Sequence, residues 1–363
     1  YLMKIAIFGA GQLAMMMIQA DHNNHHDYIV VDPSTNPPAS RYGKHIQTEY
    51  DDEDTLKRIS DECDLATIDF ENVPVEAMRK LEKSISVHPN SNALEICQDR
   101  LNEKNLFIDL GVKTTLFYKI DSLDNLKLTI EGDKSYILKS RRFGYDGKNQ
   151  YRIKPGSIIE TDLISQKCIL EELVDFESEV SLICVRSIEG DVLFYPLVEN
   201  KHSGGILTTS VCPSSYTDLQ CDAEKIGNKL LMTMNYVGVL VIEFFVTKER
   251  KLIANEMAPR VHNSGHWTIE GSNISQFQAH INAISSGIEK NQIINSKPSA
   301  MFNILSEFVS EDKLSLLKRK YNVHIHDYHK SERKGRKLGH ITYTSEEDSK
   351  LFEDISAIEK ILQ

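Results

Sequence analysis

Hydrophobic residues in the first third of the chain form short runs separated by segments with helical spacing. The runs Lys4–Phe8, Tyr28–Val31 and Leu65–Phe70 are rich in β-branched and aromatic residues, which favours strands. Residues 15–20 and 75–81 instead have the pattern of helices. Strands alternating with helices predict a parallel sheet covered by helices, so this part is expected to be an open α/β domain that ends near Gln98.

From Gly111 onward the pattern becomes richer in strands. Helices are expected at 92–110, 223–236 and 274–286, and Asn200, Lys201 and His202 are expected to link two strands. A run at 300–305 opens a third unit. The other predicted strands are 136–139, 151–153, 168–174, 177–185, 192–198, 205–211 and 237–246.

Composition and charge exclude several classes of protein. The chain has 363 residues, 40% of them hydrophobic and 26% charged, which fits a globular protein of two or three domains. A formal charge of −11 argues against general nucleic-acid binding, and no apolar run is long enough for a membrane span. A polar turn follows the first apolar run at once, so no signal peptide is expected. The six cysteines contain no CxxC pair, which favours a reduced, cytoplasmic protein.

A glycine-rich turn follows the first predicted strand. Gly9-Ala10-Gly11-Gln12-Leu13-Ala14 has the G-x-G-x-x-A spacing, and Asp32 ends the second strand. This pattern is typical of NAD-binding domains. The alternative is a helix N-terminus that holds another anion, as any doubly wound domain can provide. A polar segment, Glu71-Asn72-Val73-Pro74, lies at the end of the third strand, where open α/β sheets bind ligands, although Glu71 could instead cap the next helix.

Two glutamates near the middle of the chain predict a metal site. Glu243 interrupts the apolar run 237–246, and Glu256 lies thirteen residues later, beyond a polar turn. That is hairpin spacing, which can bring both carboxylates to one place, where a hard cation such as Mg²⁺ would relieve their repulsion. The alternative is one acid paired with a lysine and the other on a solvated face. Residues 255–267 add an arginine, two histidines, amides, a hydroxyl and the single tryptophan.

Two basic segments suggest phosphate binding. Lys139 ends a predicted strand and leads into a loop at 140–150. Together they contain two glycines and four cations, which suits a flap that closes over phosphates. Between Lys318 and Lys337 there are eight Lys or Arg residues against two acids. Each segment could instead be a solvated basic turn. Acids at nearby strand ends, Glu171, Glu172 and Glu179, would repel phosphates and are expected to face ribose hydroxyls or an amino group, unless they are solvated.

Taken together, these motifs resemble one family of the ATP-grasp superfamily, the N5-carboxyaminoimidazole ribonucleotide synthases. The most specific segments are Pro-Arg-x-His-Asn-Ser-Gly-His at 259–266 and Gly-Arg-Lys-x-Gly-His at 335–340. The other matching motifs are Gly-x-Gly-Gln-Leu at 9–13, Phe-Glu-Asn-Val at 70–73, Arg-Arg-x-Gly-Tyr-Asp-Gly-Lys at 141–148 and Glu-x-x-Val at 171–174.

The resemblance implies a chain of mixed α/β and α+β class with the ATP-grasp fold. A Rossmann-like pre-grasp domain would span 3–98, an ATP-grasp domain 99–297 with its lid at about 112–175, and a small β-rich C-terminal domain 298–363. The implied reaction is the ATP- and bicarbonate-dependent carboxylation of 5-aminoimidazole ribonucleotide through carboxyphosphate, in de novo purine biosynthesis. ATP and Mg²⁺ would be needed, and a homodimer is implied. In this family the Gly9–Leu13 turn faces the ribonucleotide, which would reverse the NAD interpretation.

The resemblance also assigns roles to individual residues, all of them expectations. Glu243 and Glu256 would hold the metal, and Arg260, His262, Asp146 and Lys330 would be catalytic. ATP would be bound by Arg100, Lys139, Gly144, Tyr145, Asp146, Gly147, Lys148, Asn149, Gln150, Glu171, Glu172, Leu173, Val174, Glu179, His202, Asn255 and Glu256. The ribonucleotide would be bound by Gln12, Glu71, Tyr145, Asp146, Arg260, His262, Asn263, Ser264, Lys330, Arg336 and Lys337.

Three residues depart from the family pattern, and two alternatives stay open. Ala10, Ala14 and Phe143 stand where glycine is common in the family. The nearest alternative is another ATP-grasp ligase, such as the formate-dependent glycinamide ribonucleotide transformylase. The second is an NAD-dependent oxidoreductase, which would leave Glu243, Glu256 and the basic flap without a role.

Overall fold

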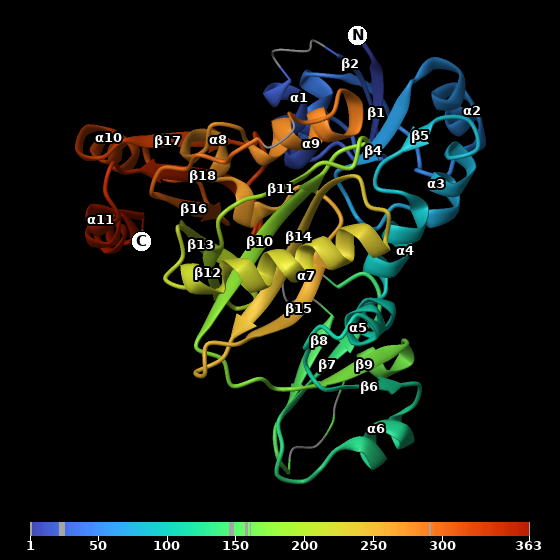
Figure 1. The fold of residues 1–363 in the computed structure, drawn as a ribbon, viewed down its shortest axis with the longest axis vertical. Helices are drawn as coiled ribbons and strands as arrows, with labels where there is room; N and C mark the ends of the chain where they lie inside the picture. The colour runs from blue at the N-terminus through green and yellow to red at the C-terminus, as the bar shows by residue number, and fades with distance from the viewer. Residues whose placement is uncertain are drawn as a thin grey trace.

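The computed structural model describes residues 2–21, 26–144, 149–156, 159, 161–289 and 292–362. These residues form three sheets that follow one another along the chain (Figure 1). Among the described residues, none of the helices is long and apolar enough to cross a membrane.

The N-terminal part is a parallel sheet with helices on its faces, as the alternating pattern predicts. Its strand order is β3-β2-β1-β4-β5. The strands are β1 (Lys4–Phe8), β2 (Asp27–Val31), β3 (Lys44–Ile46), β4 (Leu65–Ile68) and β5 (Ser86–Val87), and the helices are α1 (Gln12–Ala20), α2 (Glu53–Glu62), α3 (Val75–Leu81) and α4 (Ser91–Gln98).

The helix predicted over 92–110 is in fact two helices. Asp99 separates α4 from α5 (Arg100–Asp109) because its backbone is extended, with φ −121° and ψ 110°. Its carboxylate caps α5 by accepting a hydrogen bond from Leu101 N at 2.9 Å, and it also pairs with Arg141. An Asp is a common residue at such a cap, and here it directs Arg100 away from the line of α4.

The second sheet is antiparallel and lies at the lower end of the molecule in Figure 1. Its order is β6-β9-β7-β8, and α6 packs against it. The elements are β6 (Phe117–Ile120), α6 (Leu123–Thr129), β7 (Tyr136–Ser140), β8 (Gln150–Ile153) and β9 (Cys168–Glu172). We call this sheet with α6 the lid.

The third sheet is the largest and joins the central and C-terminal parts. Its order is β15-β14-β10-β12-β13-β16-β18-β17, with β11 also paired to β10. The third unit therefore does not form a sheet of its own, because β16 pairs with β13. The strands are β10 (Ser178–Arg186), β11 (Val192–Phe194), β12 (Val198–Ser203), β13 (Ile206–Cys212), β14 (Gly238–Val246), β15 (Leu252–Ala258), β16 (Ser299–Leu305), β17 (Val323–Asp327) and β18 (Lys337–Thr344).

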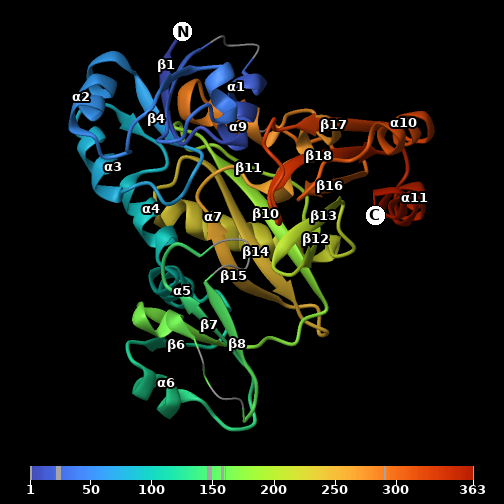
Figure 2. The ribbon, with the colours of Figure 1, turned by 180° about the vertical axis from the view of Figure 1, so that it is seen from behind.

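Helices cover both faces of the central strands (Figures 1 and 2). Leu240 and Ile242 pack in the same core as α7, whereas Val239 and Val241 pack in the core that contains α9 and Trp267. Because side chains alternate along a strand, Glu243 lies on the α9 side of β14. The helices are α7 (Gln220–Thr233), α8 (Thr268–Gly271), α9 (Gln276–Ser285), α10 (Glu311–Lys320) and α11 (Asp348–Leu362). Asn200, Lys201 and His202 were predicted to link strands, but they lie within β12 because the chain turns later, at Gly204-Gly205.

Candidate active site

A cleft of about 1090 Å³ brings together residues from all three sheets. Its walls come from the turn after β1, the end of β4, the lid, the central strands and the loop between β17 and β18. Of the residues predicted for the site, those that line the cleft are Gln12, Glu71, Arg100, Lys139, Gly144, Gln150, Glu179, His202, Glu243, Asn255, Glu256, Arg260, His262, Asn263, Lys330, Arg336 and Lys337.

The remaining predicted residues fall into three groups. Tyr145, Asp146, Gly147 and Lys148 lie outside the described residues. Glu171 and Ser264 are buried, and they are hydrogen-bonded to the cleft residues Lys139 and His262, respectively. The last four do not line the cleft: Asn149 precedes β8, Glu172 is the last residue of β9, and Leu173 and Val174 follow it.

Glu243 and Glu256 face each other across the hairpin formed by β14 and β15. They are direct partners in the antiparallel register, which confirms the predicted hairpin. Burial, together with the neighbouring Glu256, raises the pKa of Glu243 to about 7. Two carboxylates placed so close repel each other unless a cation lies between them.

This pair of acids fits a divalent cation that is completed by phosphates. Mg²⁺ is commonly held by one or two carboxylates plus substrate phosphates and water. The buried side-chain oxygen of Asn255, next to Glu256, has no hydrogen-bond partner. Within the described residues, no group of three or more His, Cys, Asp or Glu could hold a metal by itself. Glu243 and Glu256 could therefore supply part of the coordination of a divalent cation, with the rest left to phosphates and water.

Cations from α5 and the lid stand on one side of these acids. Arg100 Nη1 donates to Glu256 Oε2 at 2.6 Å, and Lys139 Nζ donates to Glu171 Oε2 at 3.1 Å. Burial alone would raise the pKa of Glu256, but Arg100 and Lys139 lower it to about 2. The alternative of a lysine-paired acid is therefore wrong in detail, since the partner of Glu256 is an arginine.

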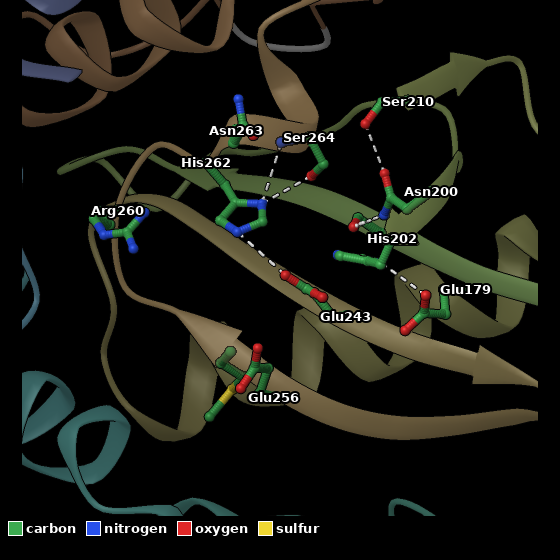
Figure 3. A network of polar contacts seen from close by, with 12 residues as sticks. Glu179, Asn200, His202, Ser210, Glu243, Glu256, Arg260, His262, Asn263 and Ser264 are labelled. Atoms are coloured by element: carbon green, nitrogen blue, oxygen red, sulfur yellow. Dashed lines mark hydrogen bonds and ion pairs between the residues drawn. The ribbon is translucent and has the colours of Figure 1, made fainter. Parts of the chain in front are cut away.

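On the other side lie two imidazoles, one beside Glu243 and one beside Glu179 (Figure 3). His202 Nδ1 lies 2.7 Å from Glu179 Oε2, and His262 Nε2 lies 3.2 Å from Glu243 Oε1. Nδ1 of His262 accepts from Ser264 N at 3.3 Å. Burial and the nearby Arg260 hold the pKa of His262 well below its usual value. A neutral ring that accepts at Nδ1 carries its proton at Nε2, so His262 can donate toward Glu243.

Arg260 forms an ion pair with Glu71, which comes from the turn after β4. Burial would raise the pKa of Glu71, but the guanidinium of Arg260 lowers it. The alternative that Glu71 caps α3 is wrong, because Pro74 is the N-cap of α3 and no side chain caps it. This ion pair joins two motifs that are 189 residues apart.

The C-terminal basic loop reaches the turn after β1. Lys330 donates to Gln12 Oε1, and Arg336 Nη1 donates to Ser331 Oγ at 2.8 Å. Burial and the neighbouring Arg336 lower the pKa of Lys330 to about 8. Charged residues crowded in this way suit a phosphate, which would replace the repulsion by attraction. The alternative of a solvated basic turn does not describe Lys330, although Lys334 and Arg333 are exposed.

The structure changes the interpretation of the glycine-rich turn. Asp69 Oδ2 accepts from Gly11 N at 2.8 Å and from Ala14 N at 3.2 Å, so a carboxylate already occupies the N-terminus of α1. The alternative of a helix N-terminus that holds another anion therefore meets two N–H groups that already have a carboxylate partner. Asp32 accepts from Ser34 N at 2.8 Å in its own turn and from Ala10 N at 3.1 Å in the glycine-rich turn, so its carboxylate links the two turns.

Sequence reasoning missed several polar residues that hold the site together. Asp69 lay inside a segment predicted as strand. Gln276 bonds both the backbone N–H and the carbonyl of His262, at 3.0 and 2.6 Å. Asn303 exchanges amide hydrogen bonds with Asn263, at 3.0 and 2.5 Å. The signal available in the sequence was a polar residue among apolar ones. Such a residue must find a partner, but the sequence does not show which residue that partner will be.

Phe143, where glycine is common in the family, has φ +62°. That is the left-handed region, which glycine adopts without steric cost and bulky residues rarely adopt. The departure thus places a bulky residue in a strained backbone conformation directly before Gly144.

A lid sheet set against a larger sheet, with acids on adjacent strands and cations from the lid, defines an ATP-grasp protein. Models of protein families agree with this class. Residues 105–277 match the ATP-grasp domain, residues 2–98 the ribonucleotide synthetase preATP-grasp domain, and residues 299–354 the phosphoribosylaminoimidazole carboxylase C-terminal domain.

The relatives identify the family within this class. The chain is 38% identical to N5-carboxyaminoimidazole ribonucleotide synthase of Pseudomonas aeruginosa, over 99% of this chain and 100% of the relative. The structure of the synthetase from Thermus thermophilus is 38% identical with a TM-score of 0.87, covering 98% of each chain. The Staphylococcus aureus synthetase complexed with ADP is 32% identical with a TM-score of 0.90, covering 99% of this chain and 97% of that one. The chain belongs to the N5-carboxyaminoimidazole ribonucleotide synthase family.

Family membership confirms the predicted fold class and resolves the two alternatives. The relatives carry the name of the carboxylating enzyme, and the C-terminal family model is that of the carboxylase. The transformylase and the NAD-dependent oxidoreductase are therefore set aside.

Proposed function

We propose that this chain is an ATP-dependent carbon–nitrogen ligase that carboxylates 5-aminoimidazole ribonucleotide to N5-carboxyaminoimidazole ribonucleotide, a step of de novo purine biosynthesis. Bicarbonate would be the co-substrate, and the location cytoplasmic. The proposal includes a homodimer and the three domains 3–98, 99–297 and 298–363. The observation that carries it is that the motifs around Lys139, Glu256 and Lys330 line one cleft.

The first half of the reaction needs a bound triphosphate and a bicarbonate. Transfer of the γ-phosphoryl group breaks its bond to the ADP oxygen and forms a bond to a bicarbonate oxygen, which gives ADP and carboxyphosphate. Phosphoryl transfer depends mainly on positioning and on neutralising negative charge. Glu243 and Glu256 would hold Mg²⁺, which supplies such neutralisation when bound. Arg100 and Lys139 would bind phosphate oxygens, and Glu179 and His202 would face the ribose of ATP.

The second half joins the activated carboxyl group to the amine. In one route the amine nitrogen attacks the carboxyl carbon of carboxyphosphate, and phosphate leaves with the electrons of the broken C–O bond. In the other route carboxyphosphate first breaks down to phosphate and carbon dioxide, and the amine attacks the carbon dioxide. In both routes the amine gives up one proton. Arg260 and His262 would hold the activated group, because both line the cleft and both can donate hydrogen bonds, and His262 lies 3.2 Å from Glu243. Gln12, Glu71 and Asn263 would bind the ribonucleotide, with Lys330, Arg336 and Lys337 on its phosphate.

Phosphate release from ATP tests this function directly. At fixed bicarbonate, adding 5-aminoimidazole ribonucleotide should stimulate release of phosphate several-fold, and the carboxylated product should form in step with it. The control is inosine monophosphate, a ribonucleotide without the free amine. If the aminoimidazole compound gives no stimulation, the proposed function is wrong.

The pH dependence tests the role of Lys330. A lysine with a pKa of about 8 loses its charge as the pH rises through that value, so its attraction for phosphate weakens above pH 8. We expect the KM for the ribonucleotide to rise by about tenfold for each pH unit well above 8, while the KM for ATP changes little. In Lys330→Arg, which stays charged, the rise should disappear. A rise of the same size in that variant would assign the effect to another group.

A further inference from the structure

A lysine outside the predicted site joins the three segments that surround the nucleotide. Lys104 lies on α5, and its side chain is 1% exposed. Its ammonium donates to Thr114 Oγ1 and Thr115 Oγ1, both at 3.0 Å, and to the carbonyl of Asn255 at 2.7 Å. All three protons of the ammonium thus have an oxygen acceptor, as a buried charge requires.

One of these acceptors sits at an irregularity beside a proposed metal ligand. In the pairing of β14 with β15, Glu243 opposes Glu256, but Phe244 opposes Ala254, so Asn255 is an extra residue. Bulges of this kind redirect neighbouring side chains and often lie next to active sites. Lys104 holds the carbonyl of the extra residue. The neighbouring Glu103 accepts from Met257 N at 2.5 Å, so α5 binds the backbone on both sides of Glu256.

The other acceptors belong to the segment that enters the lid. Thr114 Oγ1 donates to Ala254 O at 2.7 Å, and Thr115 Oγ1 donates to Glu171 Oε2 at 3.1 Å. Glu171 in turn accepts from Lys139 and lies 3.7 Å from the Lys104 ammonium. Lys104 therefore connects the end of β9, where the adenine is expected, to the strand that carries Glu256.

We propose that Lys104 is a positioning residue for the nucleotide, because its ammonium fixes the lid entrance and the Asn255 bulge at one separation. ATP must reach both, with its base near β9 and its phosphates near Glu256, so this separation has to match the length of the nucleotide. Lys104 itself does not line the cleft. The inference rests on the proposed placement of ATP and metal, and it does not involve the ribonucleotide half of the cleft.

The test compares Lys104→Met with Lys119→Met. Lys119 lies on β6 of the same lid, and its side chain is 53% exposed in an ion pair with Asp121. Isothermal titration of Mg·ADP should show a Kd raised by about tenfold or more in Lys104→Met, because a buried hydrogen-bonded centre is lost, and an unchanged Kd in Lys119→Met. In steady-state assays the KM for ATP should rise in the same proportion, while the KM for the ribonucleotide stays within about twofold.

A second variant covers the case in which Lys104→Met does not fold. Thr115→Val keeps the shape of the side chain but removes both the acceptor for Lys104 and the donor to Glu171. It should raise the Kd of Mg·ADP by about threefold to tenfold with a circular dichroism spectrum like that of the wild type. An unchanged Kd in the folded variants, or equal losses toward ATP and ribonucleotide, would overturn the inference. Titration with ADP does not depend on carboxylation. The Kd values would therefore still test the role of Lys104 if the proposed reaction were not observed.

Discussion

Glu256→Gln is expected to remove Mg²⁺-dependent turnover while the protein stays folded. The amide can still accept a hydrogen bond from Arg100, which now donates to the carboxylate, so the local packing should persist. It cannot supply the negative charge that holds a cation against the phosphates. A loss of several kcal/mol of charge stabilisation corresponds to a fall in kcat of about 10³-fold or more. The fall in kcat can be measured as the rate of phosphate release over a range of Mg²⁺ concentrations.

The matched control for this variant is Glu249→Gln in the turn of the same hairpin, where the carboxylate is exposed. Its turnover should equal that of the wild type, and both variants should unfold at temperatures close to the wild-type value. A wild-type rate in Glu256→Gln would refute the metal role. A rate restored by high Mg²⁺ alone would instead indicate that Glu243 is sufficient to hold the ion.

Local pattern was enough to locate most strands of the fold. The strand Lys4–Phe8 and the helix Val75–Leu81 have the predicted bounds, because their apolar spacing is regular and each is bounded by clear turn residues. The pairing of β16 with β13 could not be predicted, because the sequence of a strand does not show which other strand it will pair with. The break at Asp99 was missed because a capping Asp is compatible with a helix interior until its partners are known.

For the site, the residue types were predictable and their partners were not. Hairpin spacing correctly predicted that Glu243 and Glu256 would meet, since only the turn between them had to be inferred. Pairs such as Arg260 with Glu71 and Lys330 with Gln12 depend on how separate sheets dock. The roles of these residues came from family resemblance. Lys104 had no such signal, because a single lysine in an amphipathic helix usually faces water.

Replacing Arg260 by lysine should separate the two halves of the reaction. The planar guanidinium can hold Glu71 and still present further donors to a second anion, whereas an ammonium is a single point charge on a flexible stem. Because Glu71 is the nearer anion in the structure, the lysine of Arg260→Lys should stay with it. The activated carboxyl group would then lose its donor, although ATP and its phosphate-binding cations are unchanged.

The expected result is phosphate release without matching product. The ratio of carboxylated ribonucleotide to phosphate should fall by about 10²-fold, the usual cost of removing one donor to a developing anion, while the KM for ATP stays within about threefold. Arg250→Lys in the exposed hairpin turn, where the arginine pairs with Asp218, is the control and should keep the wild-type ratio. If product and phosphate fall together in Arg260→Lys, then Arg260 acts during phosphoryl transfer itself. That outcome would move its role from the carboxyl intermediate to the ATP half of the cleft.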